Sequence, residues 1–302
     1  MIVTVASGKG GTGKTTIACS LALVLPARDP LLLDCDVEAP NAHLSLKPNF
    51  DQQQPVHMLI PEVDQDRCTA CGRCAEVCPF HAVVVLGGQA LVFPELCHGC
   101  GSCARNCPEQ AIREVEKPIG VLEGGEAEAG FAFAHGVLNI GEPMAVPVIR
   151  ALKVWDAMPA SSLVIRDAPP GTACPVVETM RGSDYILLVT EPTPFGLHDL
   201  QLAAEVARAL GIPAGVIINR DGIGDQTVDA YCAQAGLPIL MRIPLSREIG
   251  AALARGETLV EAFPEYGLRF RALHDQIFGL AATKAEAANP EGAGKPGGKV
   301  RP

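Results

Sequence analysis

A glycine-rich stretch near the start of the chain has the residue types and spacing of a phosphate-binding loop. It follows an apolar run at residues 2–6 and reads Gly8-Lys9-Gly10-Gly11-Thr12-Gly13-Lys14-Thr15-Thr16. Because a helix-forming run at residues 14–25 comes next, backbone N–H groups and a helix N-terminus point at one place, where they hold phosphates. In such a loop Lys14 reaches the terminal phosphates and the Thr15 hydroxyl binds Mg2+. The stretch predicts a nucleotide site rather than a glycine-rich turn without a ligand.

Eight cysteines in the middle of the chain have the spacing of iron–sulfur ligands. They form two runs, Cys68-x2-Cys71-x2-Cys74-x3-Cys78-Pro79 and Cys97-x2-Cys100-x2-Cys103-x3-Cys107-Pro108. In such paired runs, three close cysteines bind one 4Fe–4S cluster and the fourth, before proline, binds the other. We therefore expect one cluster on Cys68, Cys71, Cys74 and Cys107, and a second on Cys97, Cys100, Cys103 and Cys78. Four-cysteine zinc sites are the alternative, but they leave the third and fourth cysteines of each run and the prolines unexplained.

Acidic residues stand at the ends of two further apolar runs. Asp34 and Asp36 follow residues 31–33, and Asp167 follows residues 163–165. Because ligands collect at the carboxyl ends of parallel strands, we expect these acids to face the nucleotide. For Asp34 and Asp36 the alternative is that they cap the turn that follows.

A lysine at the second position of the glycine-rich loop indicates which class of nucleotide-binding protein the chain resembles. With Lys9, the loop resembles the deviant Walker A loop of the superfamily of MinD, ParA, Mrp and the nitrogenase iron protein. The resemblance implies that Lys9 reaches across a dimer interface to the nucleotide of the other subunit. A solvated surface lysine is the alternative, since loop lysines are usually exposed.

The resemblance also implies roles for the remaining site residues. Asp36 lies in the switch I segment, where it positions the attacking water, and Asp34 supports the metal site. Asp167 opens a D-x-P-P-G-T segment of the Mrp-like branch and holds Mg2+ through water. Asn219, at the end of the apolar run 214–219, reads the adenine edge. The implied catalytic residues are Lys9, Lys14, Asp36 and Asp167.

The order of these motifs predicts an α/β fold: a doubly wound, mostly parallel sheet with an inserted two-cluster ferredoxin domain. We expect the ATPase domain at residues 1–60 and 116–283, the insertion at 61–115 and a disordered tail at 284–302. Within the insertion, the runs 82–86 and 90–93 form a hairpin. Residues 120–141, rich in Gly, Ala and Glu, are expected to be loop, and a final helix is expected at 268–282.

Composition excludes several classes of protein. A formal net charge of -10 argues against a footprint for nucleic acid or anionic lipid, which requires clustered Lys and Arg. No apolar run approaches the roughly 20 residues of a membrane helix and no signal segment is evident, so we expect a cytoplasmic protein without stable membrane insertion. In that compartment the 12 cysteines indicate metal binding rather than disulfides.

These features predict a Mg-dependent ATPase that binds ATP or ADP and two 4Fe–4S clusters, and that forms a homodimer on binding ATP. The function we favour from the sequence couples ATP turnover to redox chemistry or to the assembly of an Fe–S or Fe–Mo centre on a partner protein. An ATP-gated electron carrier that resembles nitrogenase iron protein is one alternative. A positioning switch of the MinD/ParA kind, with structural or sensory clusters, is the other.

Overall fold

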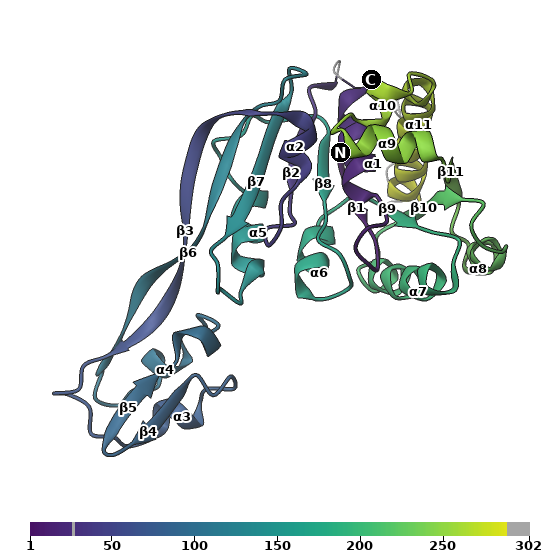
Figure 1. The fold of residues 1–302 in the computed structure, drawn as a ribbon. Coiled ribbons are helices and arrows are strands. Elements are labelled where there is room, and N and C mark those ends of the chain that lie inside the picture. The colour runs from purple at the N-terminus through teal and green to yellow at the C-terminus, as the bar shows by residue number, and fades with distance from the viewer. Residues whose placement is uncertain (26–27, 289–302) are drawn as a thin grey trace, which may run out of the picture.

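The computed structural model describes residues 1–25 and 28–288 as a layered α/β body and a cysteine-rich lobe joined by a long ribbon (Figure 1). The body is built on a nine-stranded sheet with the order β11-β10-β9-β1-β8-β2-β7-β6-β3. Its parallel strands, from one edge inward, are β11 (Ile239–Pro244), β10 (Ala214–Asp221), β9 (Tyr185–Thr190), β1 (Ile2–Ala6), β8 (Val164–Asp167), β2 (Leu31–Asp34) and β7 (Ala132–Leu138). These strands confirm the predicted mostly parallel α/β sheet.

The central strands are buried on both faces, as their continuous apolar sequences require. All residues of β9 and of β2 are buried, including Asp34 at the end of β2. Helices cover each face (Figure 1). On one side lie α1 (Lys14–Leu23), α2 (Ala42–Leu46), α9 (Arg247–Ala254), α10 (Leu259–Ala262) and α11 (Glu265–Ala288), and on the other α5 (Ala145–Lys153), α6 (Cys174–Met180), α7 (Pro194–Ala209) and α8 (Thr227–Ala235).

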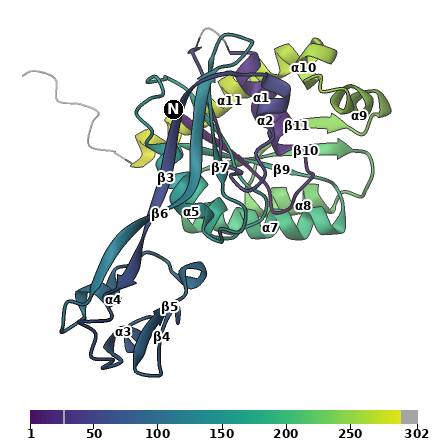
Figure 2. The ribbon, with the colours of Figure 1, turned by 60° about the vertical axis from the view of Figure 1, so that its left-hand side comes forward.

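A two-stranded antiparallel ribbon leaves the edge of the sheet and carries the lobe (Figure 2). Its strands, β3 (Asn49–Val63) and β6 (Ile112–Glu126), pair along their whole length, and β6 also pairs with β7 between Gly120 and Glu126. One end of the ribbon therefore belongs to the body and the other to the lobe. The predicted boundaries of the insertion, 61–115, fall within these two strands.

The cysteine-rich lobe contains short elements. They are α3 (Arg73–Glu76), β4 (Val83–Leu86), β5 (Gln89–Val92), the 3-10 helix η2 (Pro94–Leu96) and α4 (Ser102–Arg105). β4 and β5 pair as the predicted antiparallel hairpin, with a tight turn at Gly87 and Gly88. The lobe is thus two similar short-helix segments on either side of one hairpin.

Two predictions from the sequence were wrong. Residues 120–141, expected to be loop, contain the end of β6 and all of β7. Glycine here serves close packing: a Cβ at Gly124 would lie 2.4 Å from Met158 and 2.8 Å from Trp155. The last helix, α11, extends to Ala288, so residues 284–288 are helical rather than part of the expected tail. The rest of that tail, residues 289–302, lies outside the described residues.

Among the residues that the structure describes, no helix is both long and apolar enough to cross a bilayer.

Candidate functional site

The glycine-rich loop joins β1 to α1, as the sequence predicts, and needs glycine at its last turn. Gly13 has a φ of 92°, and a Cβ there would lie 2.6 Å from Asn219 Nδ2. That amide nitrogen donates to the Thr12 carbonyl oxygen at 2.8 Å, while Asn219 Oδ1 accepts from the Arg220 backbone N–H. Asn219 therefore braces the loop, and its predicted contact with adenine stays a prediction.

Lys14, Thr15 and Asp167 meet at the start of α1. The Thr15 hydroxyl donates to Asp167 Oδ2 at 2.6 Å, whereas the buried Oδ1 has no hydrogen-bond partner. Burial, and then the charge of Asp34, raise the pKa of the Asp167 carboxyl well above its usual range. Burial lowers the pKa of Lys14, against the opposing attraction of Asp167 and Asp36. A Mg2+ ion fits this donor set, because the unpartnered carboxylate oxygen and the adjacent hydroxyl are the hard oxygen ligands it prefers.

The two acids after β2 have different environments. Asp34 is fully buried and accepts the backbone N–H groups of Asp36, Asn41 and Ala42 at 2.9–3.1 Å. It thus holds the start of α2, which is the capping role that the sequence analysis kept as its alternative. Asp36 lines the cleft, and burial together with the neighbouring Asp34 charge raises its pKa to about 6.

These groups open onto a cleft of about 660 Å³, large enough for a nucleotide. Gly10, Gly11, Gly13, Lys14, Thr15, Thr16, Asp36 and Asn219 are the predicted residues among its lining. Gly8, Lys9 and Thr12 belong to the loop but are not among the lining residues. The far wall comes from Pro244, Ser246 and Ile249, after β11 and on α9, which the sequence analysis did not assign to the site.

Lys9 turns toward its own subunit rather than into the cleft. Its Nζ lies 2.9 Å from Oε2 of Glu191, a carboxylate only 6% exposed at the end of β9. Arg220, at the end of β10, donates to the other oxygen of Glu191 at 2.5 Å. The solvated-lysine alternative does not describe this arrangement, because Lys9 is held by a buried acid.

The cysteines of the lobe gather around two separate cavities. Each cavity is lined by three cysteines of one run and the fourth cysteine of the other run. Cys68, Cys71, Cys74 and Cys107 line the first, and Cys78, Cys97, Cys100 and Cys103 line the second. The ribbon and the hairpin bring the two runs together, so the crossed grouping expected from their spacing appears in space.

Backbone N–H groups donate to cysteine sulfurs at equivalent positions of the two runs. The first and the fourth cysteine of each run accept one such bond at 3.3–3.4 Å. The donor and acceptor pairs are Ala70 to Cys68, Gly99 to Cys97, Ala82 to Cys78 and Ala111 to Cys107. Such bonds stabilise sulfur that carries negative charge, as a metal-bound thiolate does.

A site for a single metal ion needs a closer grouping of ligands than these cavities provide. In residues 1–25 and 28–288, no group of three or more His, Cys, Asp or Glu side chains is close enough to hold one metal ion. Sulfurs that bind one zinc ion converge to about 2.3 Å from a single point, whereas the four sulfurs of a 4Fe–4S cluster bind four separate irons. The described geometry therefore does not by itself show a bound metal, and both the cluster prediction and its zinc alternative stay predictions.

Comparison with known proteins agrees with the nucleotide site. The model of the family described as "CobQ/CobB/MinD/ParA nucleotide binding domain" matches residues 3–260. The chain belongs to this family. An uncharacterized ATP-binding protein of Methanocaldococcus jannaschii is 40% identical over 265 residues, covering 86% of this chain and 81% of that protein. Another uncharacterized protein of the same organism is 29% identical over 263 residues, covering 86% of this chain and 92% of that protein.

Solved structures share the fold of this nucleotide-binding family. The septum site-determining protein MinD of Pyrococcus horikoshii, complexed with Mg-ADP, has a TM-score of 0.54 and 21% identity, covering 94% of this chain and 98% of that one. The cell division ATPase MinD of Pyrococcus furiosus has a TM-score of 0.54 and 22% identity, covering 93% and 99%. The chain thus has the MinD-like α/β fold and the nucleotide-binding domain of this family, as predicted.

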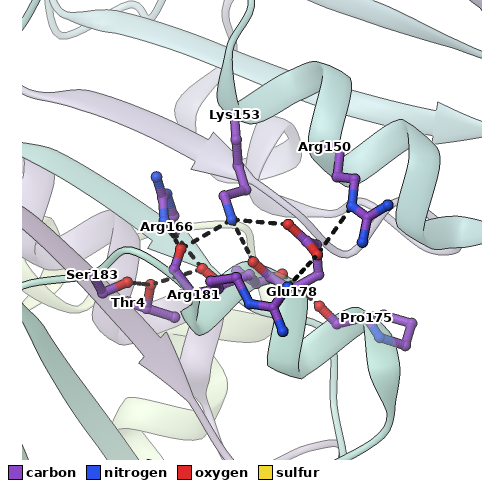
Figure 3. A network of polar contacts seen from close by, with 9 residues as sticks. Thr4, Arg150, Lys153, Arg166, Pro175, Glu178, Arg181 and Ser183 are labelled. Carbon is purple, nitrogen blue, oxygen red and sulfur yellow. Dashed lines mark hydrogen bonds and ion pairs between the residues drawn. The ribbon is translucent and has the colours of Figure 1, made fainter. Parts of the chain in front are cut away.

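In this MinD/ParA-family fold, α6 follows the Asp167 segment, and two cationic side chains, the buried Arg166 and the partly buried Lys153, donate to the far end of that helix (Figure 3). Lys153 Nζ donates to the carbonyl oxygens of Glu178 and Arg181 at 2.5 and 3.0 Å. Arg166 Nη1 donates to those of Thr179 and Arg181 at 3.2 and 3.1 Å. Cations suit the carbonyl end of a helix. Because Lys153 ends α5, which also packs on β6, the Asp167 segment is connected to the base of the ribbon.

A second connection begins at α2, which Asp34 holds. The rings of His43 on α2 and His135 on β7 make a T-shaped contact, with ring centroids 5.2 Å apart. His135 on β7 is buried, lies 3.0 Å from Glu123 Oε2 on β6, and stacks on Phe50 of β3. Helix α2 is therefore linked, through His135 of β7, to the strands that form the ribbon.

Sequence reasoning missed Glu191, Arg220 and the α5–α6 network. A signal for Glu191 was present, because it directly follows the buried strand β9 just as Asp34 and Asp167 end theirs. No comparable signal marked Lys153 or Arg166, since their partners are the Glu178 carboxylate and backbone carbonyls that lie on other elements of the chain.

Proposed function

We propose that this ATPase is a nucleotide-dependent dimeric switch of the MinD/ParA class whose cysteine-rich lobe binds two 4Fe–4S clusters, as a two-cluster ferredoxin does. The observation that carries the cluster assignment is the pair of four-cysteine cavities, each with ligands from both runs. The comparisons support the switch more than a role in redox chemistry or metal-centre assembly, because they match the nucleotide-binding family throughout.

For hydrolysis, the chain supplies charge and positioning. Lys14 and the loop N–H groups bind the phosphates, and Thr15 and Asp167 would hold Mg2+, which would supply positive charge beside the phosphoryl oxygens. Asp36 faces the cleft and orients the water that attacks the terminal phosphorus, while ADP leaves with the electrons of the broken P–O bond. Asp34 acts through α2, by fixing the backbone around Asp36.

Lys9 completes the site across the dimer. In the closed dimer its ammonium leaves Glu191 and binds the phosphates held by the partner subunit. Hydrolysis removes the terminal phosphate that it binds, and the subunits separate. The two connections at α6 and α2 then pass the change to the base of the ribbon, so the lobe responds to the nucleotide.

In the lobe, Cys68, Cys71, Cys74 and Cys107 would hold one cluster and Cys97, Cys100, Cys103 and Cys78 the other. The clusters would supply one-electron redox chemistry. Burial raises the pKa of the Cys74, Cys97 and Cys103 thiols, so cluster binding must displace protons from them.

A second candidate function is electron transfer to, or metal-centre assembly on, a partner protein. It is favoured by Cys71 and Cys100, which are exposed, so that one edge of each four-cysteine cavity faces solvent. In that case ATP-driven dimerisation would set when the lobe meets its redox partner.

The test begins with protein reconstituted without oxygen. About eight irons and about eight acid-labile sulfides per chain, with charge-transfer absorption, are expected for two clusters. Stoichiometric zinc with no such absorption would overturn the cluster assignment. Sedimentation with Mg2+ and a slowly hydrolysed ATP analogue tests the switch: the expected result is a dimer with the analogue and a monomer with ADP.

A further inference from the structure

Glu191 is a buried carboxylate that binds two cations from different elements. Its Oε2 lies 2.9 Å from Lys9 Nζ and its Oε1 lies 2.5 Å from Arg220 Nη1, so each oxygen has its own partner. The Glu191 side chain is 6% exposed, whereas those of Lys9 and Arg220 are 32% and 48% exposed. The carboxylate is therefore the buried member of the group, and the two cations reach it from the more exposed side.

The charges of this group make Lys9 the cation that can leave. A buried carboxylate without a partner is strongly destabilising, so an acid paired with Lys9 alone would resist its departure. Here Arg220 continues to neutralise Glu191 after Lys9 has moved. With Lys9 in place the group has two cations and one anion, and after Lys9 leaves it has one of each. The positive charge of Lys9 then becomes available to bind a phosphate.

The position of the group fits a resting place for Lys9. Glu191 directly follows β9, which pairs with the strand β1 that leads into the loop, and Lys9 does not line the cleft. Arg220 follows Asn219, whose amide braces the loop at Thr12, and Arg220 itself lines the cleft. Lys9, Glu191 and Arg220 thus lie at or just after the ends of the neighbouring strands β1, β9 and β10 of one subunit.

We propose that Glu191 is a positioning residue that retains Lys9 within its own subunit, and that Arg220 weakens this hold so that ATP-dependent dimerisation can release it. The inference rests on the proposed function, in which Lys9 crosses to the nucleotide of the partner subunit. Competition between Glu191 and the phosphates then sets the ATP concentration at which the dimer forms. Glu191 need not contact the nucleotide.

Two substitutions should change the concentration of ATP analogue needed for dimerisation in opposite directions. Glu191→Gln keeps the shape of the side chain but removes the charge that retains Lys9, so half-maximal dimerisation should need roughly tenfold less ATP analogue. Arg220→Gln leaves Lys9 as the cation that neutralises Glu191, so half-maximal dimerisation should need several-fold more ATP analogue. A purely structural ion cluster would give changes in the same direction, because either substitution would damage it.

The experiment is sedimentation of the full chain against a series of analogue concentrations, with ADP affinity measured for each variant to normalise nucleotide binding. In a Lys9→Ala background, Glu191→Gln should have no effect on dimerisation. Glu128→Gln, which breaks an exposed ion pair with Lys47, is the matched control and should behave as the parent does.

The outcomes separate this inference from the proposed function. A parent that dimerises while both variants shift in the same direction, or neither shifts, contradicts the inference alone. A parent that stays monomeric with the analogue contradicts the proposed switch, and the inference with it.

Discussion

The α/β body and the cysteine-rich lobe are stabilised by different kinds of core. In the body, buried aliphatic and aromatic side chains form three large clusters between the sheet and its helices. In the lobe, the buried members of the two clusters are Cys74, Val83, Ala90, Cys103 and Ile112, and Cys78, Ala82 and Cys97. Half of these are cysteines. Burial of apolar surface therefore stabilises the body, while the lobe buries little and would gain most of its stability from the clusters proposed above.

The two regions also differ in the hydrogen bonding of their polar atoms. In the body, two of the buried polar atoms without partners, Asp167 Oδ1 and Thr12 Oγ1, lie beside the loop, where a substrate or ion would bind. In the lobe, backbone N–H groups already bond to cysteine sulfurs. The polar groups of the nucleotide site are thus partly unpaired before a ligand binds, whereas the cysteine sulfurs already accept hydrogen bonds from the backbone of the lobe.

Removing iron from the reconstituted protein should have the largest effect and should separate the regions. With a chelator and a reductant, amide exchange in residues 64–111 should accelerate more than a thousandfold, because metal binding is most of the folding free energy of such a unit. Amides of β9 should keep their protection. Hydrogen exchange with mass spectrometry measures both, and equal acceleration in the two regions would mean that they share one folding unit.

Lys9→Ala should slow ATP hydrolysis about a hundredfold, the scale expected when a cation that stabilises transition-state charge from the other subunit is lost. ADP affinity of the monomer should stay within about twofold of the parent, since Lys9 does not line the cleft. Phosphate release and ADP titration measure the two. Hydrolysis at the parent rate would show that Lys9 has no part in the reaction.

Lys14→Ala should act on binding itself. Loss of a charge-assisted contact to the phosphates is worth about 2 kcal/mol, so ADP affinity should fall roughly thirtyfold. The iron content should not change, because Lys14 contacts acids of the body and none of the lobe. Calorimetric titration with an iron assay on the same preparation checks this, and a parallel loss of iron would contradict the independence of the two regions.

Glu62→Gln should have the smallest effect, because it alters the ribbon only at its surface. Glu62 Oε2 accepts from Arg113 Nε at 2.6 Å, but both side chains are more than half exposed. Such pairs contribute less than about 1 kcal/mol. The thermal midpoint of the body and the cluster absorption should both be unchanged, and a drop in either would assign the ribbon a stabilising role beyond its hydrogen-bonded ladder.

Local patterns in the sequence determined much of this protein. The loop between β1 and α1, the parallel strands, the lobe hairpin and the nucleotide-binding family all follow from short-range spacing. The reason is that a strand, a turn and a helix N-terminus are set by neighbouring residues. The ligand sets of the two cysteine runs were predicted in the same way, because their repetition encodes the crossed grouping.

Only the tertiary structure decided which distant residues meet. The pairing of β7 with β6, the capping of α2 by Asp34, and the contacts of Glu191 with Lys9 and Arg220 join segments that are far apart in the chain. Residues 120–141 carry glycines that predict loop on their own, and they become strand because neighbouring strands and Trp155 need the space. An acid at a strand end can bind a metal, cap a helix or retain a lysine. Its role depends on which residues lie at the end of the adjacent strand, and the order of strands in the sheet decides which residues those are.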